Sequence, residues 1–163
     1  LMTLEDLSEH RSTPVDPISI SYKINDTQSI RIWECPPNGQ GIIALMAIGI
    51  VEQLQKQKKI PSLDKLQHNS AEYLHVLIEA LRLAFSDGCY FVSDTSMGHV
   101  PGNELLSPNY LAERAATFQS TCANNNLVHG KPTNSSDTVY FAVTRRMAPS
   151  AHILAYFIDV TGA

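Results

Sequence analysis

The sequence predicts one domain of mixed α/β or α+β class, in which helices pack against strands. Apolar residues recur at helical spacing in residues 42–54 and 74–85. Ser107-Pro108 has the order of a cap and a first helical residue, which predicts a third helix. Four other segments have the β-branched and aromatic composition of strands, namely residues 18–23, 30–35, 138–144 and 153–160.

The bulk composition argues against two classes of protein. The 163 residues, 44% of them hydrophobic and 17% charged, suffice for a buried core. The net charge is −4, and the basic cluster Lys56, Lys58 and Lys59 is typical of a solvated helix end. We therefore expect no nucleic-acid partner bound through a basic face. No apolar stretch reaches the roughly 20 residues of a membrane span.

The amino terminus assigns no compartment. Residues 1–6 lack the basic start and the apolar core of a signal peptide, and the chain does not begin with Met. We expect any targeting signal to lie upstream in a longer parent. Localisation and membrane association stay open at this point.

The first third of the chain predicts a short helix, a hairpin and a long helix. Thr3 and Asp6 have the spacing of a capping pair. Asn25-Asp26 suits the turn between the first two strand-like segments. Residues 36–41 are rich in Pro and Gly, and they precede a helix that should fade before Pro61.

The second helix is predicted to begin at a cap on Asn69, with Glu72 three residues later, and to end at Asp87-Gly88. One face of this helix carries an apolar stripe that we expect to lie in the core. Its members are Leu74, Leu77, Ile78, Leu81, Ala84 and Phe85.

The third helix should run from its cap at Ser107 to about Gln119. Residues 122–137 are polar and contain Gly130 and Pro132, which predicts an exposed, flexible loop. Thr138 would then open a strand directly after this loop.

Several polar side chains allow a functional and a structural interpretation. Glu79 and Arg82, three apart on a helix, favour a surface ion pair over a catalytic pair. The turn Gly39-Gln40-Gly41 favours a tight helix entry over an anion site, because the other residues of a phosphate loop are missing. His68 and His75 are seven residues apart, and such a pair is more often structural than a metal site.

The cysteines and Thr138 also have plain structural interpretations. Cys35, Cys89 and Cys122 are widely spaced and odd in number, which favours buried structural thiols. Thr138 is the more interesting residue. A cut between Asp137 and Thr138 would give Thr138 a hydroxyl and a free α-amine that can act as its base. Spacing alone still favours a threonine that simply begins a strand.

Six segments carry a resemblance to a known family, together with His75 and Arg114-Ala115. They are MTLEDL at residues 2–7, PIS at 17–19, PPNGQG at 36–41, EALRLAFSD at 79–87, LLSPNY at 105–110 and DTVYFAV at 137–143. In number and order they resemble the self-processing gamma-glutamyltransferase (glutathione hydrolase) family. The matches extend from the start of the chain to about Thr144.

The resemblance implies an incomplete αββα sandwich of the N-terminal-nucleophile hydrolases. Residues 1–137 would be the C-terminal part of the large-subunit region, and residues 138–163 a truncated, divergent start of the small-subunit region. It implies Asp137–Thr138 as the processing site and Thr138 as the catalytic nucleophile. The substrate implied is a small γ-glutamyl or related acyl amide, and no metal or organic cofactor is implied.

Two departures from the family pattern shape the expected function. PPNGQG replaces the PPSSGG of glutathione-cleaving members, and Val139-Tyr140 replaces their Thr-His, as in an acylase-like side branch. After Thr144 the chain diverges, and the family's second catalytic Thr and Gly-Gly oxyanion hole have no counterpart. We therefore expect a fragment of a proenzyme that is inactive by itself and needs the missing segments to complete its fold. The alternatives are a catalytically dead interaction or folding unit, or a tail produced by a splice or frame error.

Overall fold

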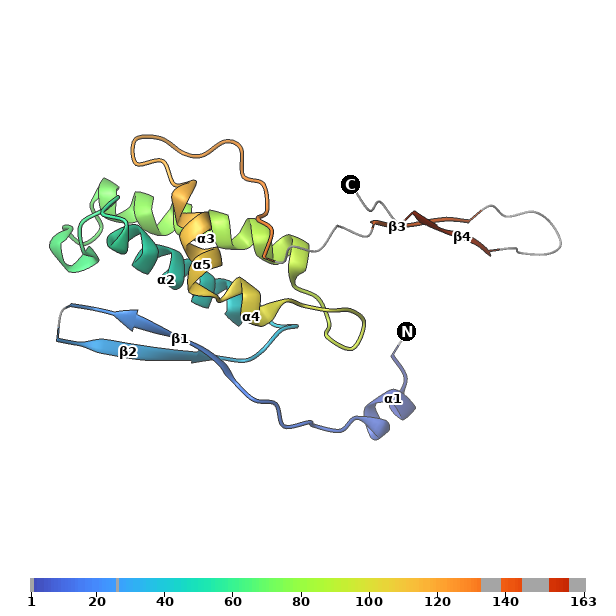
Figure 1. The fold of residues 1–163 in the computed structure, drawn as a ribbon. Helices are drawn as coiled ribbons and strands as arrows, with labels where there is room; N and C mark the ends of the chain where they lie inside the picture. The colour runs from blue at the N-terminus through green and yellow to red at the C-terminus, as the bar shows by residue number, and fades with distance from the viewer. Residues whose placement is uncertain (1, 26, 133–138, 145–152, 159–163) are drawn as a thin grey trace. The chain divides into compact units, whose positions relative to one another are not determined.

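The computed structural model describes residues 2–25, 27–132, 139–144 and 153–158 (Figure 1). The chain forms two compact units, Leu1–Pro132 and Thr133–Ala163, and each is described by itself. The first unit contains all the described helices and one hairpin. In the second unit the description covers the backbone of two strands.

The amino-terminal elements match the sequence prediction. Helix α1 (Leu4–Glu9) begins with a capping box, in which the Asp6 N–H donates to Thr3 Oγ1 and the Thr3 N–H donates to Asp6 Oδ2. Strands β1 (Ile18–Lys23) and β2 (Ser29–Glu34) pair antiparallel, with Ile18 opposite Glu34. The Asn25 side chain accepts the Thr27 and Gln28 N–H groups, which closes the turn of the hairpin.

Helix α2 (Gly41–Lys56) is the centre of the first unit. It contacts α3, α5 and both strands of the hairpin (Figure 1). A helix that is covered on several sides is apolar around most of its circumference. The residues of α2 that are buried are Ile42, Ile43, Leu45, Met46, Ala47, Gly49, Ile50, Val51, Gln53 and Leu54.

Helix α3 (Ala71–Phe91) differs from the prediction at both ends. Its cap is Ser70, whose hydroxyl accepts the Tyr73 N–H, whereas Asn69 has a left-handed backbone with φ 61°. The helix also continues through Asp87-Gly88 to Phe91. The Asp87 side chain is paired with Arg114 inside the fold. Gly88 is a glycine because it lies against Ile43, where a Cβ would come within 2.7 Å of Cγ1.

The predicted core stripe of α3 is mostly wrong. Leu74, Ile78, Leu81 and Phe85 are 40–53% exposed. The opposite face is the buried one, and it carries small and acidic residues. Small residues there allow α2 to approach closely, so side-chain size was the wrong guide to burial. The buried residues of α3 are Val76, Glu79, Ala80, Leu83, Ala84, Asp87 and Gly88.

The third predicted helix corresponds to α5 (Pro108–Ala116), with Ser107 as its cap and Pro108 at its first position. It ends about one turn before Gln119. The sequence prediction missed two single-turn elements, the 3₁₀ helix η1 (Leu63–Lys65) and α4 (Gly102–Leu105). Elements of one turn carry no measurable periodicity, so they leave no apolar pattern to detect.

The second unit contains β3 (Val139–Thr144) and β4 (Ile153–Ile158), which pair antiparallel with Val139 opposite Ile158. Both strands were predicted from composition. The predicted ends of these strands at Thr138 and Val160 lie outside the described residues.

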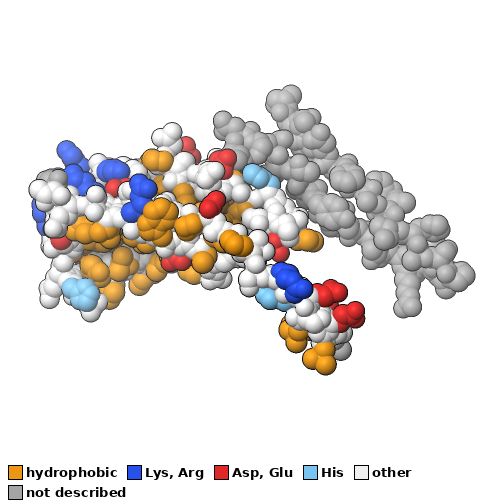
Figure 2. Space-filling model, turned by 90° about the horizontal axis from the view of Figure 1, so that it is seen from below, with side chains coloured by type: hydrophobic (Ala, Val, Ile, Leu, Met, Phe, Trp, Pro, Cys, Tyr) orange, Lys and Arg blue, Asp and Glu red, His pale blue; other side chains and the backbone are white. Residues whose placement is uncertain are grey.

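An apolar groove of about 450 Å³ lies between the hairpin, α2 and α3. Figure 2 views the chain from the hairpin side and shows hydrophobic side chains gathered on this face. Two of the residues that line the groove are themselves exposed, Ile30 on β2 and Leu81 on α3. A face of this kind marks a surface that another part of a protein can cover.

The exposure of the three cysteines differs from the sequence prediction. Cys35, Cys89 and Cys122 are exposed rather than buried, because they lie after β2, on the outer face of α3 and after α5. The prediction of buried thiols is therefore wrong.

Among the described residues, no helix combines the length and the hydrophobicity that crossing a bilayer requires.

Candidate functional site

The proposed processing residues Asp137 and Thr138 lie outside the described residues. The structure describes the chain on both sides of them. Upstream, the chain is described as far as Pro132, and downstream β3 begins at Val139, the residue after Thr138. Along the chain, the nearest described residues are therefore the end of the irregular segment that follows α5 and the first residue of β3.

The segment after α5 is fixed to α3 by two groups of contacts, each centred on a buried carboxylate. We name the first the Asp87 clamp, which consists of Asp87, Arg114, Val128 and Gly130. Asp87 Oδ2 accepts from Arg114 Nε at 2.9 Å, and Asp87 Oδ1 accepts from the Gly130 N–H at 2.8 Å. Arg114 also donates to the Val128 carbonyl at 2.9 Å. The Asp87 carboxylate, the Arg114 guanidinium and the backbone of Val128 and Gly130 thus form one hydrogen-bonded network.

Burial dominates the electrostatics of the Asp87 clamp. Asp87 is fully buried and Arg114 is 6% exposed. Burial raises the pKa of the Asp87 carboxyl above its ordinary value, and the Gly130 N–H and the Arg114 guanidinium oppose that shift. Burial likewise raises the pKa of the neighbouring Tyr110 hydroxyl, and the charge of Asp87 raises it further. A phenol with a raised pKa stays protonated, so Tyr110 serves as packing and not as a base.

The second group, the Glu79 clamp, consists of Glu79, Arg82 and Asn124. Arg82 pairs with Glu79 and donates to the Asn124 carbonyl at 3.0 Å, while Glu79 Oε2 accepts the Asn124 N–H at 3.0 Å. Glu79 is only 1% exposed. The predicted ion pair between Glu79 and Arg82 is confirmed, but its expected place on the surface is wrong, because Glu79 is buried and also accepts the Asn124 N–H.

The anion-site interpretation of Gly39-Gln40-Gly41 is not supported by the structure. Helix α2 begins at Gly41, and a Cβ there would lie 2.7 Å from Glu34 Oε2. A carboxylate of the chain itself thus lies against the first residue of the helix. The close approach of Glu34 explains why a residue without a Cβ stands at position 41. This agrees with the prediction of a tight helix entry.

The structure separates His68 and His75, the two histidines considered as a metal pair. His68 precedes α3 and packs edge-on against Tyr73, so it does not share a helix face with His75. His75 Nε2 lies 2.8 Å from the Gln119 carbonyl oxygen, a structural hydrogen bond. Within the described ranges, no group of three or more His, Cys, Asp or Glu residues is placed to hold a metal ion.

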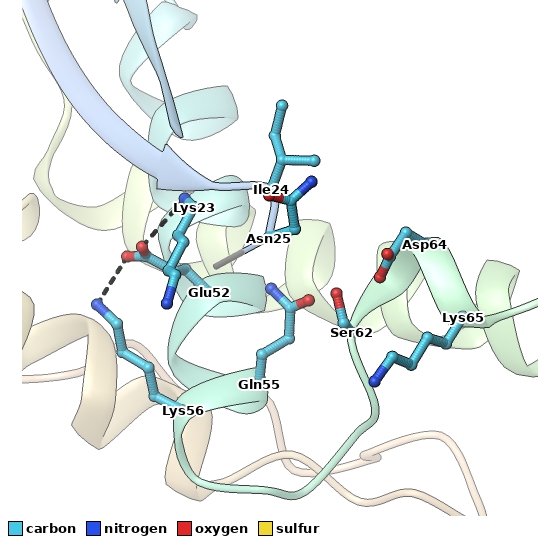
Figure 3. A pocket seen from close by; sticks show the side chains of 9 residues that line it. All are labelled: Lys23, Ile24, Asn25, Glu52, Gln55, Lys56, Ser62, Asp64 and Lys65. Atoms are coloured by element: carbon cyan, nitrogen blue, oxygen red, sulfur yellow. Dashed lines mark hydrogen bonds and ion pairs between the residues drawn. The ribbon is translucent and has the colours of Figure 1, made fainter. Parts of the chain in front are cut away.

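A polar recess of about 350 Å³ lies where β1 ends beside α2 and η1 (Figure 3). Its walls include both acidic and basic side chains. Glu52 accepts the backbone N–H of Lys23 at 3.3 Å and the Lys56 ammonium at 3.0 Å, as the dashed lines in Figure 3 show. Gln55 donates to Tyr22 and accepts the Leu63 N–H. These groups bind one another, and the arrangement has no nucleophile paired with a base.

Sequence reasoning missed the two clamps, although it named some of their members for other reasons. Asp87 was assigned to a helix end and Glu79 to a surface pair. Glu79 and Asp87 each place an acidic side chain among the buried residues of α3. Arg114 places a basic side chain among the buried residues of α5. A charge on the buried side of an amphipathic helix was the available signal, because such a charge must find a partner inside the fold.

Comparison with known proteins identifies the family. The gamma-glutamyltranspeptidase family model matches residues 1–148. The glutathione hydrolase-like YwrD proenzyme of Bacillus subtilis is 29% identical over 142 residues, which are 87% of this chain and 24% of that protein. The chain thus spans about a quarter of the length of this curated relative.

Two solved structures have a similar fold. A gamma-glutamyltranspeptidase from Pseudomonas nitroreducens, in complex with L-DON, aligns with a TM-score of 0.66 at 26% identity, over 79% of this chain and 36% of that one. A cephalosporin acylase from Bacillus halodurans aligns with a TM-score of 0.59 at 34% identity, over 86% of this chain and 22% of that one.

These likenesses confirm the fold class predicted from the resemblance. The helices and strands form a partial α/β arrangement of the N-terminal-nucleophile hydrolases, and the comparisons cover only part of each larger protein. The match to the family model includes residue 138 and both clamps. The chain belongs to the gamma-glutamyltranspeptidase family.

Proposed function

We propose that this chain is part of a proenzyme that cuts itself between Asp137 and Thr138 and then uses Thr138 as its catalytic nucleophile. The observation that carries the proposal is a threonine directly before β3, within the residues that the family model matches. The similar Bacillus subtilis protein is itself a proenzyme, which supports processing here. In this proposal residues 1–137 end the larger product and residues 138–163 begin the smaller one.

Self-cleavage needs only groups of the chain and water. The Thr138 hydroxyl oxygen attacks the Asp137 carbonyl carbon, and the C–N bond to Thr138 breaks as the nitrogen takes up a proton. Water then hydrolyses the resulting ester. The products are a carboxylate at Asp137 and a Thr138 with a free hydroxyl and a free α-amine.

Turnover of an external amide follows from the same groups. An α-amine has a pKa of about 7.7–8.0, so a useful fraction is neutral near pH 7 and can accept the hydroxyl proton. Thr138 then attacks the amide carbonyl of the donor, the amine product leaves with a proton, and water or an amine takes the acyl group. This sequence of steps requires no metal or organic cofactor.

The acyl donor is proposed as a class, γ-glutamyl or related acyl amides. A glutathione hydrolase-like protein and a cephalosporin acylase are both similar to this chain, so the resemblance reaches both kinds of donor. Oxyanion stabilisation alone is worth about 10²–10³ in rate. Family members provide it from segments beyond the part that this chain matches, and we propose that the 163 residues alone do not turn over substrate.

The test is self-cleavage of the longest reading frame that contains this chain. We expect purified wild-type protein to yield two products, Thr138→Ala to remain whole, and Thr138→Ser to cleave because serine keeps the hydroxyl. Thr133→Ala is the matched control in the same segment and should cleave as the wild type does. A whole wild-type protein that hydrolyses γ-glutamyl amides would refute the assignment of Thr138. A whole protein with no activity would favour the interaction or folding unit.

A further inference from the structure

The apolar groove between the hairpin, α2 and α3 has few groups that could orient a small ligand. Of the described residues that line it, only Tyr22 has a polar side chain, and its hydroxyl accepts a hydrogen bond from Gln55 Nε2. Sites for small molecules combine apolar walls with several polar groups that fix the ligand. The groove therefore fits an apolar segment of protein better than a small molecule.

The hairpin places its two strands over different helices. On β1, Ile20 lies where a Cβ on Gly49 of α2 would meet both Ile20 and Leu111 of α5. On β2, Ile30 lines the groove together with Leu81 of α3. Neighbouring strands of a sheet lie about 4.8 Å apart. One more strand beside β2 would therefore lie over α3 and cover the groove.

The edge of β2 that faces away from β1 is open. The sheet has two strands, so β2 pairs on one side. In an antiparallel pair, every second residue points its backbone N–H and C=O away from the partner strand. Within the described part of the chain, no backbone hydrogen bond joins the outward groups of Ser29–Glu34 to another segment. Such an edge is a template on which a further strand can pair.

Helix α3 presents an apolar stripe of matching length on the side of the groove. Leu74, Ile78, Leu81 and Phe85 recur at intervals of three or four residues and are 40–53% exposed. From the first to the last, the stripe extends about 17 Å at 1.5 Å per residue. A strand of about five residues has the same length at 3.3 Å per residue. One short strand is therefore long enough to cover the stripe.

The longer relatives provide a source for such a strand. The chain spans 24% of the similar Bacillus subtilis proenzyme and 36% of the solved Pseudomonas nitroreducens chain. A protein of that length has most of its residues outside the part that this chain matches. An exposed apolar face of this kind is where another part of the same protein can pack.

We propose that β2 is an inner strand of the sheet in the longer protein, and that a strand from outside these 163 residues pairs with its open edge. Every second side chain of that strand is apolar and packs into the groove against Ile32, Leu77 and Leu81. The two faces of α3 then have separate roles, since its small residues contact α2 and its large apolar residues contact the added strand. The inference goes beyond the proposed function and does not depend on a cut at Thr138.

The first experiment is photo-cross-linking in the protein made from the longest reading frame that contains this chain. Leu81→p-benzoylphenylalanine puts a reactive group in the groove. Met97→p-benzoylphenylalanine is the control, at an 85% exposed position that does not line the groove. Peptide mass spectrometry should find position 81 linked to a segment outside residues 1–163 in which apolar residues alternate, and position 97 not linked to that segment.

The second experiment is amide hydrogen exchange in the same longer protein, because exchange separates an added strand from any other covering. The β2 amides that point away from β1 should be protected to within about tenfold of those that bond β1. Leu81→Glu places a charge in the groove and should speed their exchange by about tenfold or more, while the amides of α2 keep their protection. Met97→Glu should leave the exchange of β2 unchanged.

Four outcomes would overturn the inference. The link from position 81 could lead to a second copy of the protein or to a segment within the 163 residues, which would name a different occupant. Position 81 could give no link, which would show an open groove. The outward β2 amides could exchange freely in the wild-type protein, which would exclude a paired strand. The reading frame could end with these 163 residues, which would leave no source for the strand.

The two proposals fail separately. A precursor that does not cut at Thr138, but shows both the link from position 81 and the protected β2 edge, would refute the proposed function and support this inference. A protein that cuts at Thr138 with an open groove would do the reverse.

Discussion

Replacing Arg114 by Met should be among the most damaging single changes in the first unit. Arg114 is 6% exposed and donates to Asp87, Ser86 and the Val128 carbonyl. Methionine keeps much of the side-chain volume but removes every one of these donors. The Asp87 carboxylate, which is fully buried, would then retain the Gly130 N–H as a neutral partner.

The magnitude follows from the cost of leaving a buried charge without its counter-charge, which is about 3–5 kcal/mol. Total stabilities of domains lie near 5–15 kcal/mol, so this loss is a large share. For a chain of this size it corresponds to a fall in Tm of roughly 6–20 °C. The Lys56→Met control breaks an exposed pair with Glu52 and should cost less than about 1 kcal/mol.

The assay is equilibrium unfolding in urea, followed by circular dichroism, for the wild-type chain, Arg114→Met, Asp87→Asn and the double variant. The double variant removes the buried charge together with its partner. We expect it to be more stable than the sum of the single changes predicts, by at least about 1 kcal/mol. Additive effects, or an Arg114→Met cost below about 1 kcal/mol, would refute the idea that an uncompensated carboxylate causes the loss.

Three further predictions concern the fold. Leu45→Ala, at a fully buried position of α2, should cost about 2–5 kcal/mol in urea unfolding, whereas Ile78→Ala on the exposed face of α3 should cost far less; equal costs would contradict the burial of the two faces. Gly88→Ala should lower stability by about 1–3 kcal/mol despite the better helix propensity of alanine, because of the contact with Ile43, and Ile43→Val should recover part of the loss. Hydrogen bonds from Thr3 lower the pKa of Asp6, so the cap of α1 is stabilised above the ordinary Asp pKa and loses this as pH falls through the lowered value. The Thr3 amide shift in NMR titrations should follow that change, and Asp6→Asn should abolish it.

The sequence predicted the elements whose signals are local. The Thr3–Asp6 capping box, the Ser107-Pro108 start of α5 and the long apolar run of α2 each depend on residues within a few positions of one another. The turn at Asn25 is local in the same way. These features need no knowledge of the rest of the fold, and they appear where they were expected.

Features that depend on distant partners were misjudged. Which face of α3 is buried depends on how closely α2 approaches Ala80, Ala84 and Gly88, and that cannot be read from side-chain size. The end of the helix was placed at Asp87-Gly88 because this pair usually ends helices. Here Asp87 is held by Arg114, 27 residues away, and by Gly130, 43 residues away.

The candidate site also has one part that the sequence indicated and another that it did not. Thr138 rests on a family resemblance, and its residue type and its place before a strand were all that the sequence contributed. The clamps upstream of it became visible only in three dimensions. Acids inside an amphipathic helix were the signal that sequence reasoning had and did not use.

The central claim is that Thr138 becomes an amino-terminal residue and carries the acyl group. Its most direct test is peptide mass spectrometry of the cleaved protein after brief reaction with a γ-glutamyl anilide and an acid quench. We predict a peptide that begins at Thr138, with part of it heavier by one γ-glutamyl group on that residue. A smaller product that begins at any other residue, or an acyl group found on a different side chain, would contradict the account.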